Sequence, residues 1–222
     1  MCSSDLRTVV INGRISARSF PRYRLVRPLF RRVLADIDRF CMQGEESAQR
    51  IVELGADPKR VTVTGSLKFD SLQLPSPTAH GRLREPVLRY FRLSPARVVV
   101  VAGSTMKPED AAVLSAFARI RSIAPGALLV IAPRQRERFA EVERLAADEG
   151  FSVTRRSDLP IDGEPRTDVV VLDTFGELAQ VYQLATVVFV GGSLADHGGH
   201  NILEPAVFGK PIVFGPHMHN FR

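Results

Sequence analysis

Short apolar runs alternate along the chain with longer segments whose apolar residues recur at helical spacing. The runs predict strands at residues 8–12, 38–42, 61–63, 97–102, 127–132, 151–153, 168–172, 187–190 and 212–214. The intervening segments, such as 45–54 and 135–148, predict helices. Strands that alternate with helices are typical of parallel sheets covered by crossover helices, so the predicted fold class is α/β.

This alternation is interrupted in a segment without periodicity that carries Pro75 and Pro77. Prolines in a polar, aperiodic segment are typical of a connection between domains. We therefore predict an incomplete first lobe at residues 1–70, a linker at 71–79 and a second, truncated lobe at 80–222.

Charge and cysteine content narrow the choice of partners and compartment. The formal net charge of +6 and the pI of about 9.9 favour an anionic partner such as a nucleotide, a phospholipid or a nucleic acid. Cys2 and Cys41 are too few for a disulfide framework. The sequence contains no apolar run of the roughly 20 residues that span a bilayer, so it predicts no transmembrane helix.

Arginines dominate the segment between Leu6 and Ala35, which contains no acidic residue. Residues 25–33 have apolar side chains at helical spacing, which predicts a helix with one apolar and one basic face, bent early by Pro28. A solvated helix face is the ordinary explanation of such a charge run. The missing acids favour a surface that faces phosphate or anionic lipid. The candidate residues of that surface are Arg18, Arg22 and Arg24.

Small and polar residues follow four predicted strands of the second lobe. They are Gly103-Ser104-Thr105, Pro133-Arg134, residues 173–176 and Gly191-Gly192-Ser193. Because the carboxyl ends of parallel strands meet at one edge of a sheet, these turns are expected to lie together. Each turn alone is explained by helix capping. Together, with the guanidinium of Arg134 and the hydroxyl of Ser104, they predict a phosphate site.

The loop after the last of these turns leads to Asn201 and Glu204, near the start of a predicted helix. A carboxylate at Glu204 could accept hydrogen bonds from both hydroxyls of a ribose. The ordinary alternatives are helix capping by Asn201 and compensation of the helix dipole by Glu204. His197 and His200 have a spacing that could seat a metal, but no third ligand of firm spacing accompanies them, and we predict no metal.

The sequence has no Gly-x-Gly-x-x-Gly motif after its first strand and no P-loop motif, which disfavours dinucleotide oxidoreductases and P-loop phosphotransferases. Two α/β lobes with a nucleotide-type site on the second indicate a two-lobed glycosyltransferase. Motifs along nearly the whole chain resemble those of the 3-deoxy-D-manno-octulosonic acid (Kdo) transferases of lipopolysaccharide synthesis. The segments that carry this resemblance are NGRIS, GSLKFD, VAGST, APR with ERF, GEL, GGS, GGHNILEPA and GPH with NF, in the family's order.

The resemblance implies a GT-B fold of two Rossmann-like lobes, with cytidine monophosphate-Kdo (CMP-Kdo) as donor and a lipid A precursor, lipid IVA, as acceptor. It implies an inverting transfer without metal or other cofactor and no nucleic-acid partner. It also implies a peripheral place on the anionic cytoplasmic face of the bacterial inner membrane. The donor contacts that carry over are Ser104, Arg134, Gly192, Ser193, Gly199, Asn201 and Glu204, with Lys68 at the junction of the lobes.

The sequence also departs from the family pattern. The general base, a glutamate early in the family's first lobe, and the membrane anchor are expected upstream of Thr8, and the family continues beyond Arg222. Met106 and Gln135 stand where histidines are common. We therefore expect residues 1–222 alone to bind donor weakly at best and to be inactive as a transferase. The alternatives are another two-lobed nucleotide-sugar transferase or epimerase, and a basic module that binds anionic lipid.

Overall fold

The computed structural model describes residues 6–67 and 89–221. The chain divides into two compact units, Met1–Gln73 and Leu74–Arg222, each of which is described by itself. Lys68 and the predicted linker at residues 71–79 lie outside the described residues. The predicted domain limits therefore stay a prediction.

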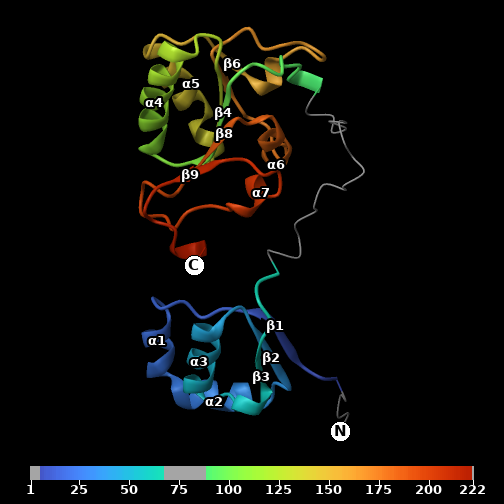
Figure 1. The fold of residues 1–222 in the computed structure, drawn as a ribbon. Helices are drawn as coiled ribbons and strands as arrows, with labels where there is room; N and C mark the ends of the chain where they lie inside the picture. Colours follow the sequence, from blue (N-terminus) through green and yellow to red (C-terminus); the bar gives the residue numbers. More distant parts are fainter. Residues whose placement is uncertain (1–5, 68–88, 222) are drawn as a thin grey trace. The chain divides into compact units, whose positions relative to one another are not determined.

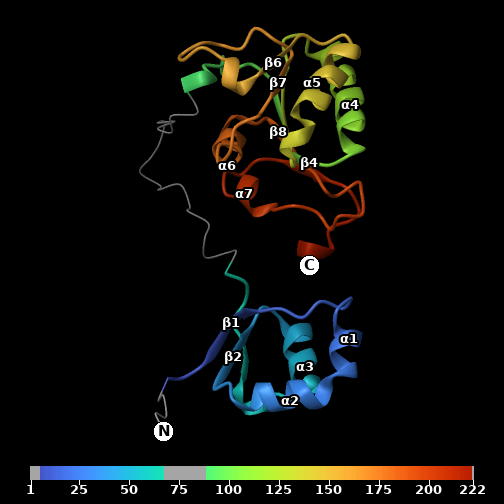
Figure 2. The same ribbon diagram turned by 180° about the vertical axis from the view of Figure 1, so that it is seen from behind.

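The first unit is a three-stranded parallel sheet with its helices on one face (Figures 1 and 2). Phe40 and Met42, which are 1% exposed, and Leu54, which is fully buried, form the centre of its core. The sheet order is β1-β2-β3, so β1 is an edge strand, and Val9 and Ile11 on it are 48% and 66% exposed. The elements are β1 (Val9–Gly13), α1 (Phe20–Leu25), α2 (Arg27–Ala35), β2 (Arg39–Met42), α3 (Glu45–Leu54), a 3-10 turn at Pro58–Arg60 and β3 (Val61–Val63).

The arginine-rich segment forms two helices where the sequence predicted one bent helix. The chain leaves helical geometry at Val26 (φ −110°, ψ 26°), two residues before Pro28. Proline is favoured in the first turn of a helix, where its missing N–H would have no partner. Pro28 therefore lies at the start of α2, and the predicted bend is replaced by a break before it.

The second unit is a six-stranded parallel sheet in the order β6-β7-β5-β4-β8-β9. Helices α4 and α5 cover one face and α6 and α7 cover the other (Figures 1 and 2). The strands are β4 (Val99–Thr105), β5 (Leu128–Pro133), β6 (Val153–Arg155), β7 (Val169–Val171), β8 (Val187–Val190) and β9 (Ile212–Phe214). The helices are α4 (Glu109–Ile123), α5 (Phe139–Asp148), α6 (Leu178–Val181) and α7 (Leu203–Ala206), with 3-10 turns at Arg136–Arg138, Arg156–Asp158, Tyr182–Leu184 and His219–Phe221.

Alternate residues of β4 enter two separate cores, one on each face of this sheet. Val101 packs in a cluster with Tyr182, whereas Ala102 packs in a cluster with Leu114 and Phe117 of α4. Burial on both faces explains why the strand reads as a continuous apolar run. The predicted α/β class with parallel sheets is confirmed in both units.

Three predicted elements differ from those observed in the second unit. Strand β4 continues to Thr105, three residues past the predicted end. The strand predicted at 151–153 is observed at Val153–Arg155, and the helix predicted from residue 135 begins as α5 only at Phe139, after a 3-10 turn. In each case the boundary depends on contacts with distant segments, which local periodicity does not encode.

Candidate functional site

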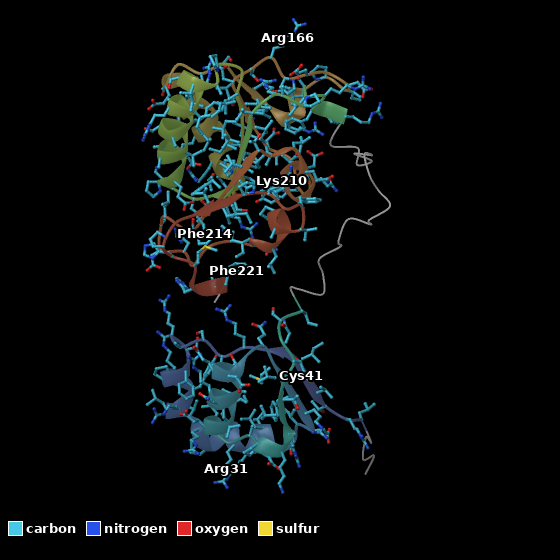
Figure 3. All side chains as sticks on the ribbon, in the orientation of Figure 1. Arg31, Cys41, Arg166, Lys210, Phe214 and Phe221 are labelled. Carbon is cyan, nitrogen blue, oxygen red and sulfur yellow. The ribbon has the colours of Figure 1, made fainter. Side chains whose placement is uncertain are left out.

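Four neighbouring strands of the second unit end at one edge of the sheet, as the turns predicted. Strands β7, β5, β4 and β8 are adjacent and parallel. Figure 3 shows Arg166, which precedes β7, at one end of the unit and Phe221, which follows β9, at the other. The candidate site is at the Phe221 end, where the carboxyl ends of the strands lie.

Glu109, in the first turn of α4, lies beneath the glycine turn that follows β8. Its carboxylate is 1% exposed and accepts backbone N–H groups from both sides of the site. Oε2 accepts from Met106 at 2.8 Å and from Gly192 at 2.7 Å, and Oε1 accepts from Ser193 at 2.9 Å and Leu194 at 2.8 Å. The turn is therefore fastened to α4 through a single side chain.

The pKa of Glu109 shows that these hydrogen bonds hold a charged carboxylate. Burial would raise the pKa, but the backbone hydrogen bonds from Gly192, Met106, Leu194 and Ser193 outweigh it, and the pKa is lowered. Hydrogen bonds to an ionised acceptor are the stronger kind. The glycine turn thus encloses an anion that belongs to the protein.

Asp110, the next residue of α4, joins the ends of β4 and β5. It accepts a hydrogen bond from the Thr105 hydroxyl at 2.6 Å and forms a buried ion pair with Arg138. The hydroxyl of Thr105 is therefore engaged within the protein rather than facing a ligand. Arg138 follows the Pro133-Arg134 turn. The first turn of α4 is therefore bonded to the glycine turn after β8 through Glu109, and to the segment after β5 through Asp110.

Ser193 is fully buried, and its hydroxyl donates to the Val190 carbonyl at 2.6 Å and accepts from the Gly215 N–H at 2.9 Å. Its side chain thus links β8 to the segment after β9. Its predicted contact with a donor stays a prediction. Gly192 and Gly199, with φ of 68° and 75°, occupy backbone conformations that other residues rarely adopt.

Arg134 and His200 bring the β5 turn next to the loop after β8. The side chain of Arg134 is exposed, and no ion pair to it is found among residues 6–67 and 89–221. Burial lowers the pKa of His200, and the charge of nearby Arg134 lowers it further. The Nε2 atom of His200 is buried and has no hydrogen-bond partner within the described part of the chain. A neutral imidazole thus lies close to a free guanidinium.

Asn201 and Glu204 form the polar pair at the start of α7 that the sequence singled out. The Asn201 Oδ1 accepts from Leu203 N–H at 3.1 Å, and its Nδ2 donates to Glu204 Oε1 at 2.9 Å. Both side chains are partly buried. The N-cap of α7 is Ile202 rather than Asn201, whereas Glu204 lies in the first turn, as the dipole alternative requires. The Asn201 amide also orients the Glu204 carboxylate.

Ser104 lies at the end of β4 in a left-handed conformation with φ of 55°. Its carbonyl oxygen contacts Gly191 so closely that a Cβ there would collide with it. The structure therefore brings together Ser104 and the 191–200 loop, and separately Arg134 with His200. All of these predicted donor residues, with Asn201 and Glu204, belong to the second unit, and their role as donor contacts stays a prediction.

The predicted membrane-facing arginines, Arg18, Arg22 and Arg24, are exposed in the first unit. Neighbouring apolar residues are exposed as well, and Figure 3 shows Arg31 of α2 projecting from the surface. The exposed apolar residues of α1, α2 and the break between them are Tyr23, Leu25, Val26, Leu29 and Val33. No helix within the described ranges is long and apolar enough to span a bilayer.

The histidines of the loop do not gather as metal ligands. His217 and His219 lie 3.4 Å and 3.7 Å from the Asp196 carboxylate, and both are ion-pair contacts of one exposed acid. A search of residues 6–67 and 89–221 finds no cluster of three or more His, Cys, Asp or Glu suited to a metal. The absence of a metal from the reaction stays a prediction.

Two features of this edge were missed from the sequence. Glu109 was not singled out from the sequence, because its partners in the glycine turn follow 83 or more residues later. Phe175 is 59% exposed after β7, with the Arg136 guanidinium 3.7 Å from its ring centroid. An aromatic residue in an otherwise small and polar turn was the available signal for Phe175.

Comparison with known sequences identifies relatives for both units. Residues 1–71 match the sequence model of the 3-deoxy-D-manno-octulosonic-acid transferase (Kdo transferase) family. A bifunctional glycosyltransferase/methyltransferase of Fusobacterium nucleatum is 35% identical over 96% of this chain and 32% of its own length. A 3-deoxy-D-manno-octulosonic acid transferase of Haemophilus influenzae is 34% identical over 96% of this chain and 48% of its own length. The chain thus spans half or less of these relatives.

Comparison with solved structures identifies a similar second unit. The C-terminal CMP-Kdo binding domain of WaaA from Acinetobacter baumannii is 38% identical. It matches 56% of this chain and 65% of that domain, with a TM-score of 0.51.

Proposed function

Because the chain belongs by sequence to the Kdo transferase family, we propose that its second unit binds CMP-Kdo and that the protein transfers Kdo to a lipid A precursor. The observation that carries the proposal is that Arg134 lies near His200, and that Asn201, the next residue of the chain, is hydrogen-bonded to Glu204. The 38% identity to a CMP-Kdo binding domain supports the choice of nucleotide.

The charges of the site suit a nucleotide-sugar donor. CMP leaves as an anion, and a free guanidinium such as Arg134 stabilises the charge that grows on the phosphate. The Asn201 amide holds one oxygen of Glu204, and the second oxygen is available to accept from a ribose hydroxyl. We propose that the reaction inverts the transferred carbon and uses no metal. The acceptor hydroxyl then needs a general base, and we propose that this base lies outside the donor-site residues.

Binding of CMP by the 222-residue chain tests this proposal. Isothermal titration with CMP should give saturable binding, and Glu204→Ala should weaken it at least about tenfold, because hydrogen bonds to a charged acceptor contribute about 1.5–3 kcal/mol. Glu149→Ala, at an exposed acid after α5, is the matched control and should bind CMP as the wild type does. Equal CMP affinity of the Glu204→Ala and wild-type chains would contradict the assignment of Glu204.

A different nucleotide-sugar enzyme of the same build is the second candidate. Titration with UMP under the same conditions separates the two, since CMP and UMP share the ribose and phosphate and differ only in the base. Tighter binding of CMP supports a CMP-Kdo donor. Tighter binding of UMP would support the alternative enzyme.

We also propose that the exposed arginines of the first unit contact an anionic membrane surface, at the cytoplasmic face of the bacterial inner membrane. Arg18, Arg22 and Arg24 lie close in sequence to exposed Leu25 and Leu29. Basic residues beside exposed apolar ones are typical of interfacial helices.

Vesicle co-sedimentation tests this contact. Phosphatidylglycerol vesicles should retain the chain, and phosphatidylcholine vesicles should not, because each basic residue near an anionic surface contributes about 1 kcal/mol. The double variant Arg22→Glu with Arg24→Glu should reduce the fraction of the chain that the vesicles retain. The control Arg119→Glu with Arg144→Glu, on exposed helix positions of the second unit, should reduce this fraction less. Equal loss in both pairs would indicate a response to net charge alone.

A further inference from the structure

The glycine turn after β8 is built as an anion site and is already occupied. The backbone N–H groups of Gly192, Ser193 and Leu194 point to the same place, and the Glu109 carboxylate fills it at 2.7–2.9 Å. Convergent N–H groups of this kind bind phosphate in many proteins. Here the anion is supplied from α4, 83 or more residues earlier in the chain.

The position of the turn depends on this carboxylate. Gly192 N–H and Ser193 N–H have no other acceptor among the hydrogen bonds of the described residues, so loss of the charge would leave buried donors unpaired. The same turn is bonded onward to the loop that carries the candidate donor residues. Gly199 N–H donates to the Gly192 carbonyl at 2.7 Å, and His200 N–H donates to the Gly191 carbonyl at 3.2 Å.

Glu109 lies within the protein rather than facing the candidate ligand. It is 1% exposed, and its carboxylate is enclosed by Met106 on one side and the glycine turn on the other. Within the described ranges, its carboxylate forms no hydrogen bond with Arg134, Asn201 or Glu204. Glu109 therefore acts on the donor site through the backbone of the 191–200 loop and through its charge, which by itself would raise the pKa of nearby His200.

We propose that Glu109 is a positioning residue of the donor site. Its carboxylate takes the place of a ligand anion in the glycine turn and thereby fixes the loop that presents His200, Asn201 and Glu204. The donor's phosphate is consequently left to Arg134 rather than to the N–H groups of residues 192–194. The effect on donor binding rests on the proposed function, whereas the fixing of the turn does not.

Glu109→Gln is the decisive variant, because glutamine keeps the shape but replaces one acceptor oxygen by a donor and removes the charge. Two quantities are measured well below the melting temperature of each variant: hydrogen exchange of the amides of residues 192–194, and the Kd for CMP. We expect exchange at these amides to quicken and the Kd to rise, each at least about tenfold. Should Glu109→Gln not fold, Glu109→Asp, which keeps the charge and shortens the reach, should show the same pair of changes more weakly.

Two controls separate positioning from a general loss of stability. Asp110→Asn removes the other buried acid of the same helical turn and should lower the melting temperature while amides 192–194 stay protected. Glu143→Gln, at a half-exposed acid paired with Arg155, should change neither quantity.

Protected amides 192–194 in Glu109→Gln would overturn the proposal, and so would rapid exchange with an unchanged Kd for CMP. A wild-type chain that does not bind CMP would refute the proposed function instead. In that case, exchange of the three amides alone decides whether Glu109 fixes the turn.

Discussion

At the scale of single residues, the two acids that open α4 resemble each other in sequence and differ in partner. The carboxylate of Glu109 accepts hydrogen bonds from backbone N–H groups, whereas the carboxylate of Asp110 pairs with the guanidinium of Arg138. Both are 1% exposed. A buried charge is tolerated only where hydrogen bonds or an opposite charge compensate it. Because the two carboxylates are compensated by different groups, they should respond differently to pH and to substitution.

The stabilising effect of Glu109 should be lost in acid. Its pKa is lower in the folded protein than its ordinary value of 4.5, so the folded state is stabilised above that value and loses the stabilisation as pH falls through the folded-state pKa. The melting temperature of the wild type should therefore exceed that of Glu109→Gln most at neutral pH. The difference should shrink below about pH 4.5, as measured by calorimetry. A difference that is constant from pH 7 to 3 would contradict this prediction.

Removal of Asp110 should destabilise the second unit strongly. Asp110→Ala removes the buried carboxylate that pairs with Arg138 and leaves that guanidinium, within the described residues, only its 3.3 Å contact with the Glu141 carboxylate. Breaking a buried ion pair costs about 3–5 kcal/mol. Chemical denaturation should report the loss as a lower free energy of unfolding. Glu143→Ala, which breaks the half-exposed pair with Arg155, should cost about 1 kcal/mol or less.

The sequence predicted the residues of the site better than their contacts. Asn201 and Glu204 could be selected because they lie three residues apart beside a glycine-rich loop, and the structure pairs them. The role of Glu109 could not be predicted, since an acid in a first helical turn is equally explained by the helix dipole. Its partners are distant in sequence, and only the folded sheet brings them together.

At the scale of elements, buried strands were predicted more accurately than helix ends. Strands such as β8 are apolar on both faces, so their runs are visible in the sequence. The break between α1 and α2 was not predicted, because helical spacing of apolar residues continues across Val26. Helix α3 covers the predicted range 45–54 and is followed by Gly55 in a left-handed conformation with φ of 117°.

Gly55→Ala should therefore destabilise the first unit. A side chain at this φ is strained, and a Cβ would also lie 3.0 Å from the Cβ of Arg31 on α2. The expected cost is about 1 kcal/mol or more, measured by urea denaturation. Gly44→Ala, at the N-cap of α3, where a Cβ meets nothing within 4 Å and the backbone is extended, adds neither strain nor a collision and should cost less than Gly55→Ala.

At the scale of the whole molecule, the two units differ in how completely they bury a core. The second has six strands with an apolar cluster on each face, whereas the first has three strands with helices on one face. Burial of apolar surface is the main stabilising contribution to folding, so the second unit should be the more stable.

Residues 74–222 should fold without the first unit and bind CMP with the affinity of the full chain. All the described candidate donor residues lie in this unit. Circular dichroism and calorimetric titration of the separate unit test the prediction. A folded unit with weaker binding would indicate that residues 1–73 contribute to the donor site.

The edge of β1 should govern how the chain behaves in concentrated solution. A parallel edge strand with exposed Val9 and Ile11 offers unpaired backbone groups to any neighbouring strand. Light scattering of the purified chain should therefore rise with protein concentration, as molecules add strands to one another. Ile11→Lys should suppress this self-association, because a charged side chain on an edge strand disfavours pairing with another strand. Ile123→Lys, at an 84% exposed position on α4, should not suppress it. Solubility would then be set by one strand of the smaller unit.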